Sequence, residues 1–194
     1  MDIEKVEEYM LNFLQKNLPA NLLYHNVNHT KDVLNAAVTL AENEGVNGEE
    51  LTLLKTAVWF HDSGFSIQNK NNEEIGCAIA KKILPGLNYT PLQIEKVCSL
   101  IMATKIPQSC TNLLEQIICD ADLDYLGRED FWELSKRLYE EIGKEEEIDD
   151  KAWYELQADF LEEHHYFTAT ANRLRNDTKQ KHLQKIKQRI ASFK

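Results

Sequence analysis

Glycine and proline are scarce in this chain, which has seven and four of them among 194 residues. Because turns between short strands rely on these two residue types, their scarcity argues against a many-stranded protein and favours long helices. Long apolar runs are missing as well: no segment approaches the ~20 residues that span a bilayer, and the charged N-terminus lacks the apolar segment of a signal peptide. We therefore expect a cytoplasmic protein without a membrane segment.

Cysteine pairs at metal-binding spacing are also missing. The sequence has four cysteines, and none belongs to a CxxC pair or a zinc-finger pattern. Each lies among helix-forming residues, where a free thiol behaves as a small apolar side chain. We therefore predict buried thiols instead of disulfides for Cys77, Cys98, Cys110 and Cys119.

The net charge of −10 argues against a general nucleic-acid surface, which needs concentrated lysine and arginine. It does not argue against a small phosphorylated substrate, because a bound metal ion can reverse the local field. The apolar and charged fractions, 43% and 28%, are those of an ordinary globular protein. The length suits a single domain over residues 1–194. The sequence leaves open whether identical chains assemble into a homo-oligomer.

Apolar residues recur at three- and four-residue steps, which predicts an all-helical fold with non-bundle packing. The first helix ends before Pro19, Thr30 caps the second, and Thr90 caps a helix with Pro91 in its first position. The expected helices cover residues 1–17, 30–45, 51–60, 73–84, 91–104, 113–126 and 131–142, with one or two more over 153–194. We expect a loop at 63–72 and a solvated acidic turn at 144–150.

Histidines gather in two short segments next to predicted helix ends. Residues 24–29 read Tyr-His-Asn-Val-Asn-His, and residues 59–64 read Trp-Phe-His-Asp-Ser-Gly at the end of a strongly apolar helix. A charged His-Asp pair is costly to bury unless it is paired or bound to a metal ion. Taken alone, such a pair is more often a helix cap, with His29 simply on the surface.

A third segment shifts the interpretation toward a metal site. Residues 117–127 read Ile-Ile-Cys-Asp-Ala-Asp-Leu-Asp-Tyr-Leu-Gly, so that Asp120, Asp122 and Asp124 interrupt an otherwise apolar helix. Carboxylates on a buried face imply a cation, and His and Asp ligands together suit Mn, Fe, Zn, Co or Ni. Mixed nitrogen and oxygen ligation with open positions is what a metal-activated water requires.

In this order, His29, the His61-Asp62 pair and Asp122 resemble the motif of the HD superfamily of metal-dependent phosphohydrolases. The Tyr-His-Asn stretch at 24–26 is similar to one found in cyclic-nucleotide phosphodiesterases and in a group of predicted HD phosphohydrolases. The resemblance implies an all-helical core in which two histidines and two aspartates hold a divalent metal ion. The candidate ions are Mn, Fe, Zn, Co, Ni and Mg.

The resemblance covers about residues 20–130, which we expect to form an HD-like core followed by C-terminal helices over about 131–194. Residues 72–76 (Asn-Glu-Glu-Ile-Gly) and 100–104 (Leu-Ile-Met-Ala-Thr) also have counterparts in relatives. Relatives with two metals carry extra histidines after the HD pair, whereas this chain has none between Asp62 and His164, and Asn72 stands where one is expected. A single metal, or a second metal bound only through substrate and water, is therefore favoured, and an oxygenase on this fold is disfavoured.

The last ligand is open between two aspartates. Asp122 matches the Ala-Asp-Leu form of the family, but Asp120 lies just before Ala121 and could take the role. The two are about 200° apart on a helix, so they are not expected to bind one metal ion together. We favour Asp122.

Two residues receive catalytic roles by the same resemblance. His25 matches the histidine that protonates the leaving oxygen, and histidine as a residue type can donate a proton near neutral pH. The alternative is that His25 packs against Tyr24 or caps the next helix. Asp62 is expected to orient a water molecule as well as bind metal.

Glu73 and Glu74 could reach the site through bound water or a hydrogen bond to phosphate, or lie in a solvated first helical turn. Lys105 and Arg128 are candidates for a phosphate contact. His164 and His165 could line the pocket mouth, although core packing or surface display is favoured.

These observations predict a metal-dependent phosphohydrolase or phosphodiesterase that hydrolyses a phosphoester or phosphoanhydride bond of a small phosphorylated substrate, with a nucleotide favoured. A second hypothesis is a metal-binding nucleotide sensor with weak or no turnover. The third is the HD-fold oxygenase, which the missing histidines disfavour. The sequence does not name the substrate, because loops shape the pocket.

Overall fold

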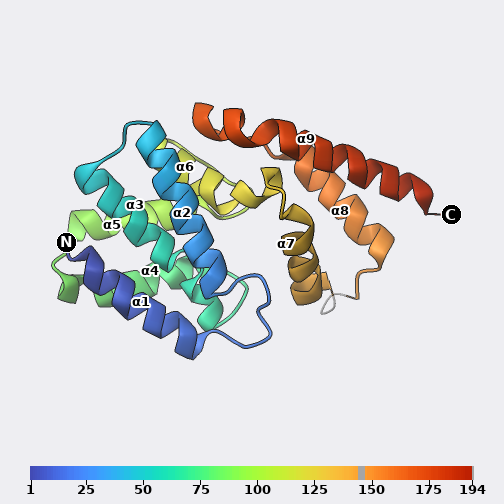
Figure 1. Cartoon of the computed structure of the whole chain (residues 1–194). Helices are drawn as coiled ribbons and strands as arrows, with labels where there is room; N and C mark the ends of the chain where they lie inside the picture. The colour runs from blue at the N-terminus through green and yellow to red at the C-terminus, as the bar shows by residue number, and fades with distance from the viewer. Residues whose placement is uncertain (144–146, 194) are drawn as a thin grey trace. The chain divides into compact units, whose positions relative to one another are not determined.

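The computed structural model describes residues 1–143 and 147–193, and within them every regular element is helical (Figure 1). The all-helical prediction is therefore confirmed. The chain divides into two compact units, Met1–Asp122 and Leu123–Lys194. The expectation of one domain over 1–194, with an HD-like core over about 20–130, stays a prediction.

The first unit is built around a buried central helix. Helix α3 has an almost continuous apolar run and packs against α1, α2 and α5 (Figure 1). Its Leu54, Val58 and Phe60 are completely buried, and burying such side chains stabilises the fold by about 1.5–3 kcal/mol each. The elements of this unit are α1 (Ile3–Asn17), α2 (Val27–Asn43), α3 (Gly48–Phe60), η1 (Ser63–Ser66), α4 (Asn72–Ile83), η2 (Leu84–Leu87), α5 (Pro91–Ala103) and α6 (Leu113–Asp122).

The second unit is held together by its last helix, α9, which packs against α8 and η3. The Arg175 guanidinium donates to the Asp124 carboxylate at 2.7 Å. The Lys179 ammonium donates to the carbonyl of His164, the residue that follows α8 and caps it. The elements are η3 (Asp124–Gly127), α7 (Phe131–Leu138), the π-helical turn η4 (Tyr139–Gly143), α8 (Asp150–Glu163) and α9 (Ala169–Ser192).

Several predicted helix boundaries agree with the structure. Helix α1 ends at Asn17, just before Pro19, as predicted. Thr90 caps α5, and Gln93 completes a reciprocal capping box with it. The segment 153–194 contains α8 from its fourth residue and all of α9, so two helices close the chain. Lys194 itself lies outside the described residues, as do residues 144–146 of the predicted acidic turn.

Other boundaries were wrong for local reasons. Asn26, not Thr30, caps α2, because the Asn26 side chain accepts from the Asn28 amide at 2.9 Å. The helix predicted over 113–126 stops at Asp122, where Leu123 leaves helical geometry and η3 follows. The helix predicted over 131–142 changes to the π-helical turn η4 after Leu138. The predicted loop 63–72 begins with η1, in which the buried Ser63 hydroxyl donates to the Phe60 carbonyl.

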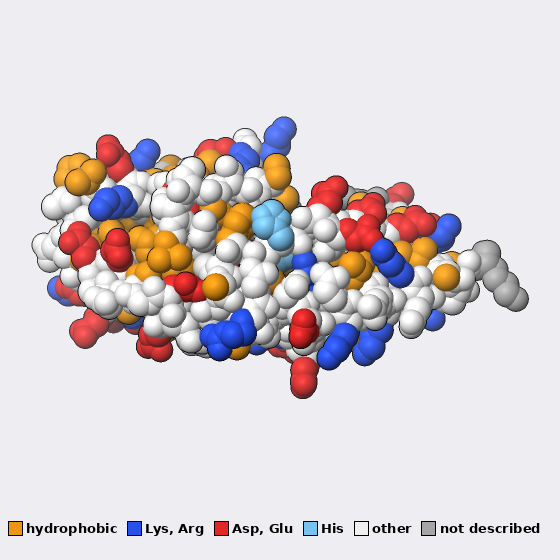
Figure 2. Space-filling model, turned by 90° about the horizontal axis from the view of Figure 1, so that it is seen from above, with side chains coloured by type: hydrophobic (Ala, Val, Ile, Leu, Met, Phe, Trp, Pro, Cys, Tyr) orange, Lys and Arg blue, Asp and Glu red, His pale blue; other side chains and the backbone are white. Residues whose placement is uncertain are grey.

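None of the described helices combines the length and the apolar character that crossing a membrane requires. Acidic and basic side chains are interspersed on the face drawn in Figure 2.

Cys77, Cys98 and Cys119 are buried, as predicted, whereas Cys110 is only half-buried because it lies between α5 and α6.

Candidate metal centre

His29 lies in the first turn of α2, and the start of that helix is fixed by Asn26. The Asn26 side chain caps the helix and also donates to the carbonyls of Leu22 and Leu23, at 3.3 and 2.9 Å. The ring of the buried Tyr24 packs on the His29 imidazole, with centroids 4.7 Å apart. The Tyr-His-Asn stretch therefore orients His29 by a cap and a ring contact.

His61 lies directly after α3 and is buried at 1% exposure. Its Nδ1 lies 2.7 Å from the carbonyl oxygen of Val58, and since a carbonyl only accepts, Nδ1 carries the proton of the neutral imidazole. The lone pair of that imidazole is then on Nε2, and Nε2 has no hydrogen-bond partner of good geometry among the described residues. A backbone carbonyl that holds the far nitrogen is the usual support for a metal-binding histidine.

Asp62 follows immediately, and two glycines allow the segments around it to pack closely. A Cβ atom on Gly64 would lie 2.0 Å from the carbonyl oxygen of Asn72, and one on Gly76 would lie 2.7 Å from that of Phe60. Glycine at both positions lets α4 lie directly on η1. Asp62 itself lies between α3 and η1, and one of its carboxylate oxygens, Oδ2, is buried and without a partner of good hydrogen-bond geometry in the described part of the chain.

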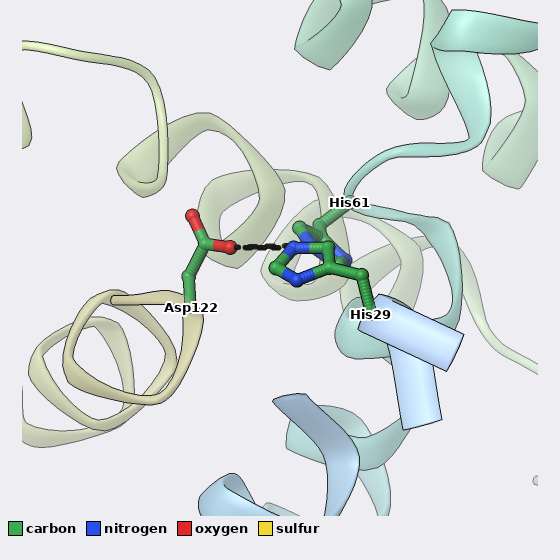
Figure 3. A group of neighbouring side chains, drawn as sticks. All are labelled: His29, His61 and Asp122. Carbon is green, nitrogen blue, oxygen red and sulfur yellow. Dashed lines mark hydrogen bonds and ion pairs between the residues drawn. The ribbon is translucent and has the colours of Figure 1, made fainter. Parts of the chain in front are cut away.

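Asp122 is the last residue of α6, and α6 packs along α2 and α5. Its carboxylate points at the two imidazoles, as Figure 3 shows. Asp120, the alternative ligand, is buried on the same helix at 1% exposure, but the carboxylate beside the histidines is that of Asp122. The structure therefore brings together His29, His61 and Asp122, whose ligand atoms all lie within 4.8 Å of one another.

Four side-chain atoms converge on this point. His29 Nε2 lies 3.3 Å from Asp62 Oδ2 and 3.1 Å from Asp122 Oδ1. His61 Nε2 lies 3.2 Å from the same Asp62 oxygen and 3.4 Å from the same Asp122 oxygen. Each nitrogen therefore lies between two carboxylates, and each carboxylate between two nitrogens.

These separations fit a shared cation better than direct hydrogen bonds. A charge-assisted hydrogen bond between an imidazolium and a carboxylate is about 2.7–2.9 Å long, which is shorter than all four. Atoms about 2.1 Å from one metal ion lie about 3.0 Å apart at octahedral angles and about 3.4 Å apart at tetrahedral angles. The four distances, 3.1 to 3.4 Å, fall in that range. The residues present thus fit a divalent metal ion.

The charges of the cluster point the same way. Burial lowers the pKa of His29, but the neighbouring Asp122 and Asp62 carboxylates outweigh burial and raise this pKa to about 9. Burial likewise lowers the pKa of His61, and Asp62 and Asp122 raise it well above its ordinary value. Burial raises the pKa of both aspartates, but the two histidines outweigh burial: they bring the pKa of Asp122 down to about 2 and lower that of Asp62 well below its ordinary value. In the absence of a cation, two imidazolium groups therefore neutralise the two carboxylates, and one divalent ion can replace the two protons.

His25 lies beside this cluster. Its ring stacks on Phe65 with centroids 4.4 Å apart and meets the His29 ring edge-on at 5.8 Å. It also contacts Tyr24, as the alternative interpretation of this residue expected. Phe65 was not predicted from the sequence; its aromatic ring three residues after Asp62 is the signal that could have identified it.

Of the other candidate residues in the first unit, Lys105 donates to Glu74 in an exposed ion pair, so its ammonium already has a carboxylate partner. Glu73 lies beside Glu74 in the first turn of α4, where the helix dipole stabilises acidic side chains. Asn72 is buried in that turn, and its side-chain oxygen has no partner among the described residues.

The remaining candidates belong to the second unit. Arg128 pairs with the carboxylate of Asp130. His164 contacts Lys179 through Nδ1 and through its carbonyl, and His165 is exposed with its ring near Phe167.

No family model and no curated protein matches this sequence. Solved structures do match over nearly the whole chain. A predicted HD superfamily hydrolase from an uncultured Thermotogales bacterium is 19% identical, with 96% of this chain and 92% of that chain covered and a TM-score of 0.63. Bacillus subtilis YpgQ in complex with ADP is 18% identical, with 97% and 95% covered and a TM-score of 0.69.

A protein from Lactobacillus plantarum is 17% identical, with 98% of this chain and 97% of that chain covered and a TM-score of 0.67. At these identities the likeness concerns the fold. The chain therefore has the all-helical fold of an HD-type hydrolase structure, as the sequence resemblance predicted.

Proposed function

We propose that the chain is a metal-dependent phosphohydrolase that cleaves a phosphoester or phosphoanhydride bond of a nucleotide. The observation that carries this proposal is the convergence of two imidazole nitrogens and two carboxylate oxygens within 3.1–3.4 Å of their neighbours. A buried cluster of this composition, supported from behind by the Val58 carbonyl, is suited to hold a divalent ion.

His29, His61, Asp62 and Asp122 would hold the ion, with Mn, Fe, Zn, Co, Ni or Mg as the candidates. When bound, the ion polarises a phosphoryl group and makes hydroxide available near neutral pH. Asp62, which contacts both imidazoles through one oxygen, is proposed to orient the attacking water as well.

His25 is proposed to donate a proton to the leaving oxygen. It precedes α2, and its ring is fixed between Phe65 and the aromatic ring of Tyr24. The ring centroids of His25 and His29 lie 5.8 Å apart, so His25 is next to the proposed metal position. It is not one of the four converging groups. A general acid at that place could reach a substrate atom that the proposed metal-binding groups do not contact.

A nucleotide is proposed as the substrate because YpgQ, which shares this fold, was solved in complex with ADP. A single metal is proposed because the sequence has no histidine between Asp62 and His164. The same observation disfavours oxygen chemistry, which we do not propose. A cytoplasmic location and the absence of a nucleic-acid surface belong to the same proposal, and homo-oligomer formation stays open.

The test is a screen of purified protein against nucleoside mono-, di- and triphosphates and cyclic nucleotides, with Mn, Mg, Co, Ni, Zn or Fe(II) added in turn. Products are separated by chromatography, and released phosphate is measured. We expect hydrolysis of at least one nucleotide that depends on the added metal and is lost in His61→Ala. Tight nucleotide binding without any product would instead support the sensor hypothesis. Metal-independent hydrolysis that survives His61→Ala would contradict both.

A further inference from the structure

The sulfur atoms of Cys110 and Cys119 lie 3.1 Å apart. A disulfide bond is about 2.05 Å long, so an approach of about 1 Å would bring them to bonding distance. Cys110 is half-buried in the segment between α5 and α6, and Cys119 is buried in α6. Neither residue is part of the proposed metal centre.

Contacts on both sides of the pair hold the two sulfurs together. The Cys119 thiol donates to the Ala103 carbonyl at 3.1 Å, and the Gln108 side chain donates to the Cys119 carbonyl at 3.2 Å. The buried Glu115 carboxylate accepts from the Thr111 amide and hydroxyl, both at 2.7 Å. The segment that carries Cys110 is therefore fastened to α6 before and after the cysteine.

We propose that Cys110 and Cys119 are a redox-active pair, which peroxide converts to an intrachain disulfide. Hydrogen peroxide first oxidises the more exposed Cys110 thiol to a sulfenic acid and is reduced to water. The Cys119 sulfur then attacks the Cys110 sulfur, the S–S bond forms, and the sulfenic oxygen leaves as a second water. In sum, two thiols lose two electrons and two protons, and one peroxide becomes two waters.

Burial sets the speed of this reaction. It raises the pKa of the Cys110 thiol, and it raises the pKa of Cys119 further still. Because the thiolate is the reactive form, oxidation is slow at pH 7 and accelerates as the pH rises. The pair is thus suited to respond to sustained oxidant, and the reaction reverses with a dithiol reductant.

The disulfide would tie α6 to the chain segment that follows α5. Cys119 precedes Asp122 by three residues, so the bridge lies one helical turn from the carboxylate beside His29. Closing this loop restricts the unfolded chain and is expected to raise the melting temperature by about 5 °C.

Proteolytic digestion shows which of the four cysteines are joined. Trypsin places Cys110 and Cys119 on one peptide, residues 106–128, and places Cys77 and Cys98 on the separate peptides 71–81 and 97–105. Cleavage after Glu115 then splits peptide 106–128 between its two cysteines. Oxidation is therefore expected to lower the mass of peptide 106–128 by about 2 Da, for two hydrogens lost, with its halves still joined after cleavage at Glu115.

The experiment compares the full-length chain before and after hydrogen peroxide. We expect the denatured protein to fall from four alkylatable thiols to two, the melting temperature to rise, and dithiothreitol to reverse both changes. Cys110→Ser should abolish the joined peptide and the temperature rise. Cys98→Ser is the matched control: Cys98 and Cys77 donate to each other's carbonyls at 3.8 and 3.5 Å, away from the proposed bridge, so this variant should still form it.

A bridge between peptides 71–81 and 97–105 in place of the 106–128 product would overturn the proposal. So would disulfide-linked dimers as the main product, or full retention of four thiols at pH 8.5 under peroxide that oxidises a free thiol peptide.

Discussion

The Nε2 atom of His29 lies 3.1 Å from Oδ1 of Asp122, although 93 residues separate them in the sequence. The contact joins the first turn of α2 to the last residue of α6, and these helices pack along each other. Since each side chain is fixed by its own helix, imidazole and carboxylate are positioned before any ion binds. Such preorganisation lowers the entropy lost on binding.

Replacing His61 or Asp62 with alanine is expected to abolish metal retention, because each removes one of four converging donors. The metal-free variants should also unfold more easily by about 3 kcal/mol, since a buried ionised partner loses its counter-charge. Metal content of the purified protein by atomic emission, and urea unfolding, measure the two effects.

The control for these variants is His165→Ala, which removes an exposed histidine from the second unit and should keep about one metal per chain. A double variant of His61 and Asp62 that still retains its full metal content would contradict the proposal of a metal centre at this place.

The two aspartates of α6 are expected to differ. Asp122→Ala should lose metal and activity, because its carboxylate contacts both imidazoles at 3.1 and 3.4 Å. Asp120→Ala should keep most of its metal, although the loss of a buried side chain lowers its stability. Metal titration of the two purified variants decides between them, and the reverse pattern would transfer the ligand role to Asp120.

His25→Ala should keep its metal and lose roughly 10²–10⁴-fold in kcat on a substrate with a poor leaving group. An alkoxide must be protonated as its bond to phosphorus breaks, whereas nitrophenolate leaves without a proton. The defect should therefore be large for a nucleotide ester and small for a nitrophenyl phosphoester.

Rates on both substrates, with the metal content of each preparation, check this prediction. Equal losses would show that His25 positions substrate or metal, and unchanged rates would leave it only a packing role against Phe65.

Metal binding is expected to release about two protons at pH 7, because the pKa of His29 is raised to about 9 and that of His61 well above its ordinary value. Both imidazoles are then protonated in the metal-free protein, and both must lose a proton to bind. Affinity should fall as the pH falls, by up to about 100-fold per pH unit. Calorimetry in buffers of different ionisation enthalpy counts the protons, and an affinity unchanged between pH 6 and 8 would contradict the charge state described above.

Much of this arrangement could be predicted because it depends on local signals. The apolar run up to Phe60 fixed the position of α3, and therefore the place of His61 and Asp62 at its end. The Thr90-Pro91 start of α5 was equally clear, because a cap and a proline act within one turn.

Features that depend on contacts distant in sequence could not be predicted in this way. The side of α6 that faces the histidines follows from its packing on α2, so periodicity alone left Asp120 and Asp122 open. The Thr30 cap was wrong because Asn26 competes for the same role four residues earlier and also binds the preceding turn. The thiol contact of Cys110 with Cys119 arises from the path of the chain between α5 and α6, for which the sequence has no pattern.

The close approach at Gly64 has a consequence for how this chain tolerates mutation. Any Cβ atom there meets the Asn72 carbonyl, so even alanine must push α4 away from η1 and move the preceding Asp62. In a screen of all substitutions, position 64 should tolerate replacement as poorly as Asp62 does, and small side chains should be accepted little better than large ones. A record of permitted substitutions would then mark as chemically essential a residue whose contribution is to leave space.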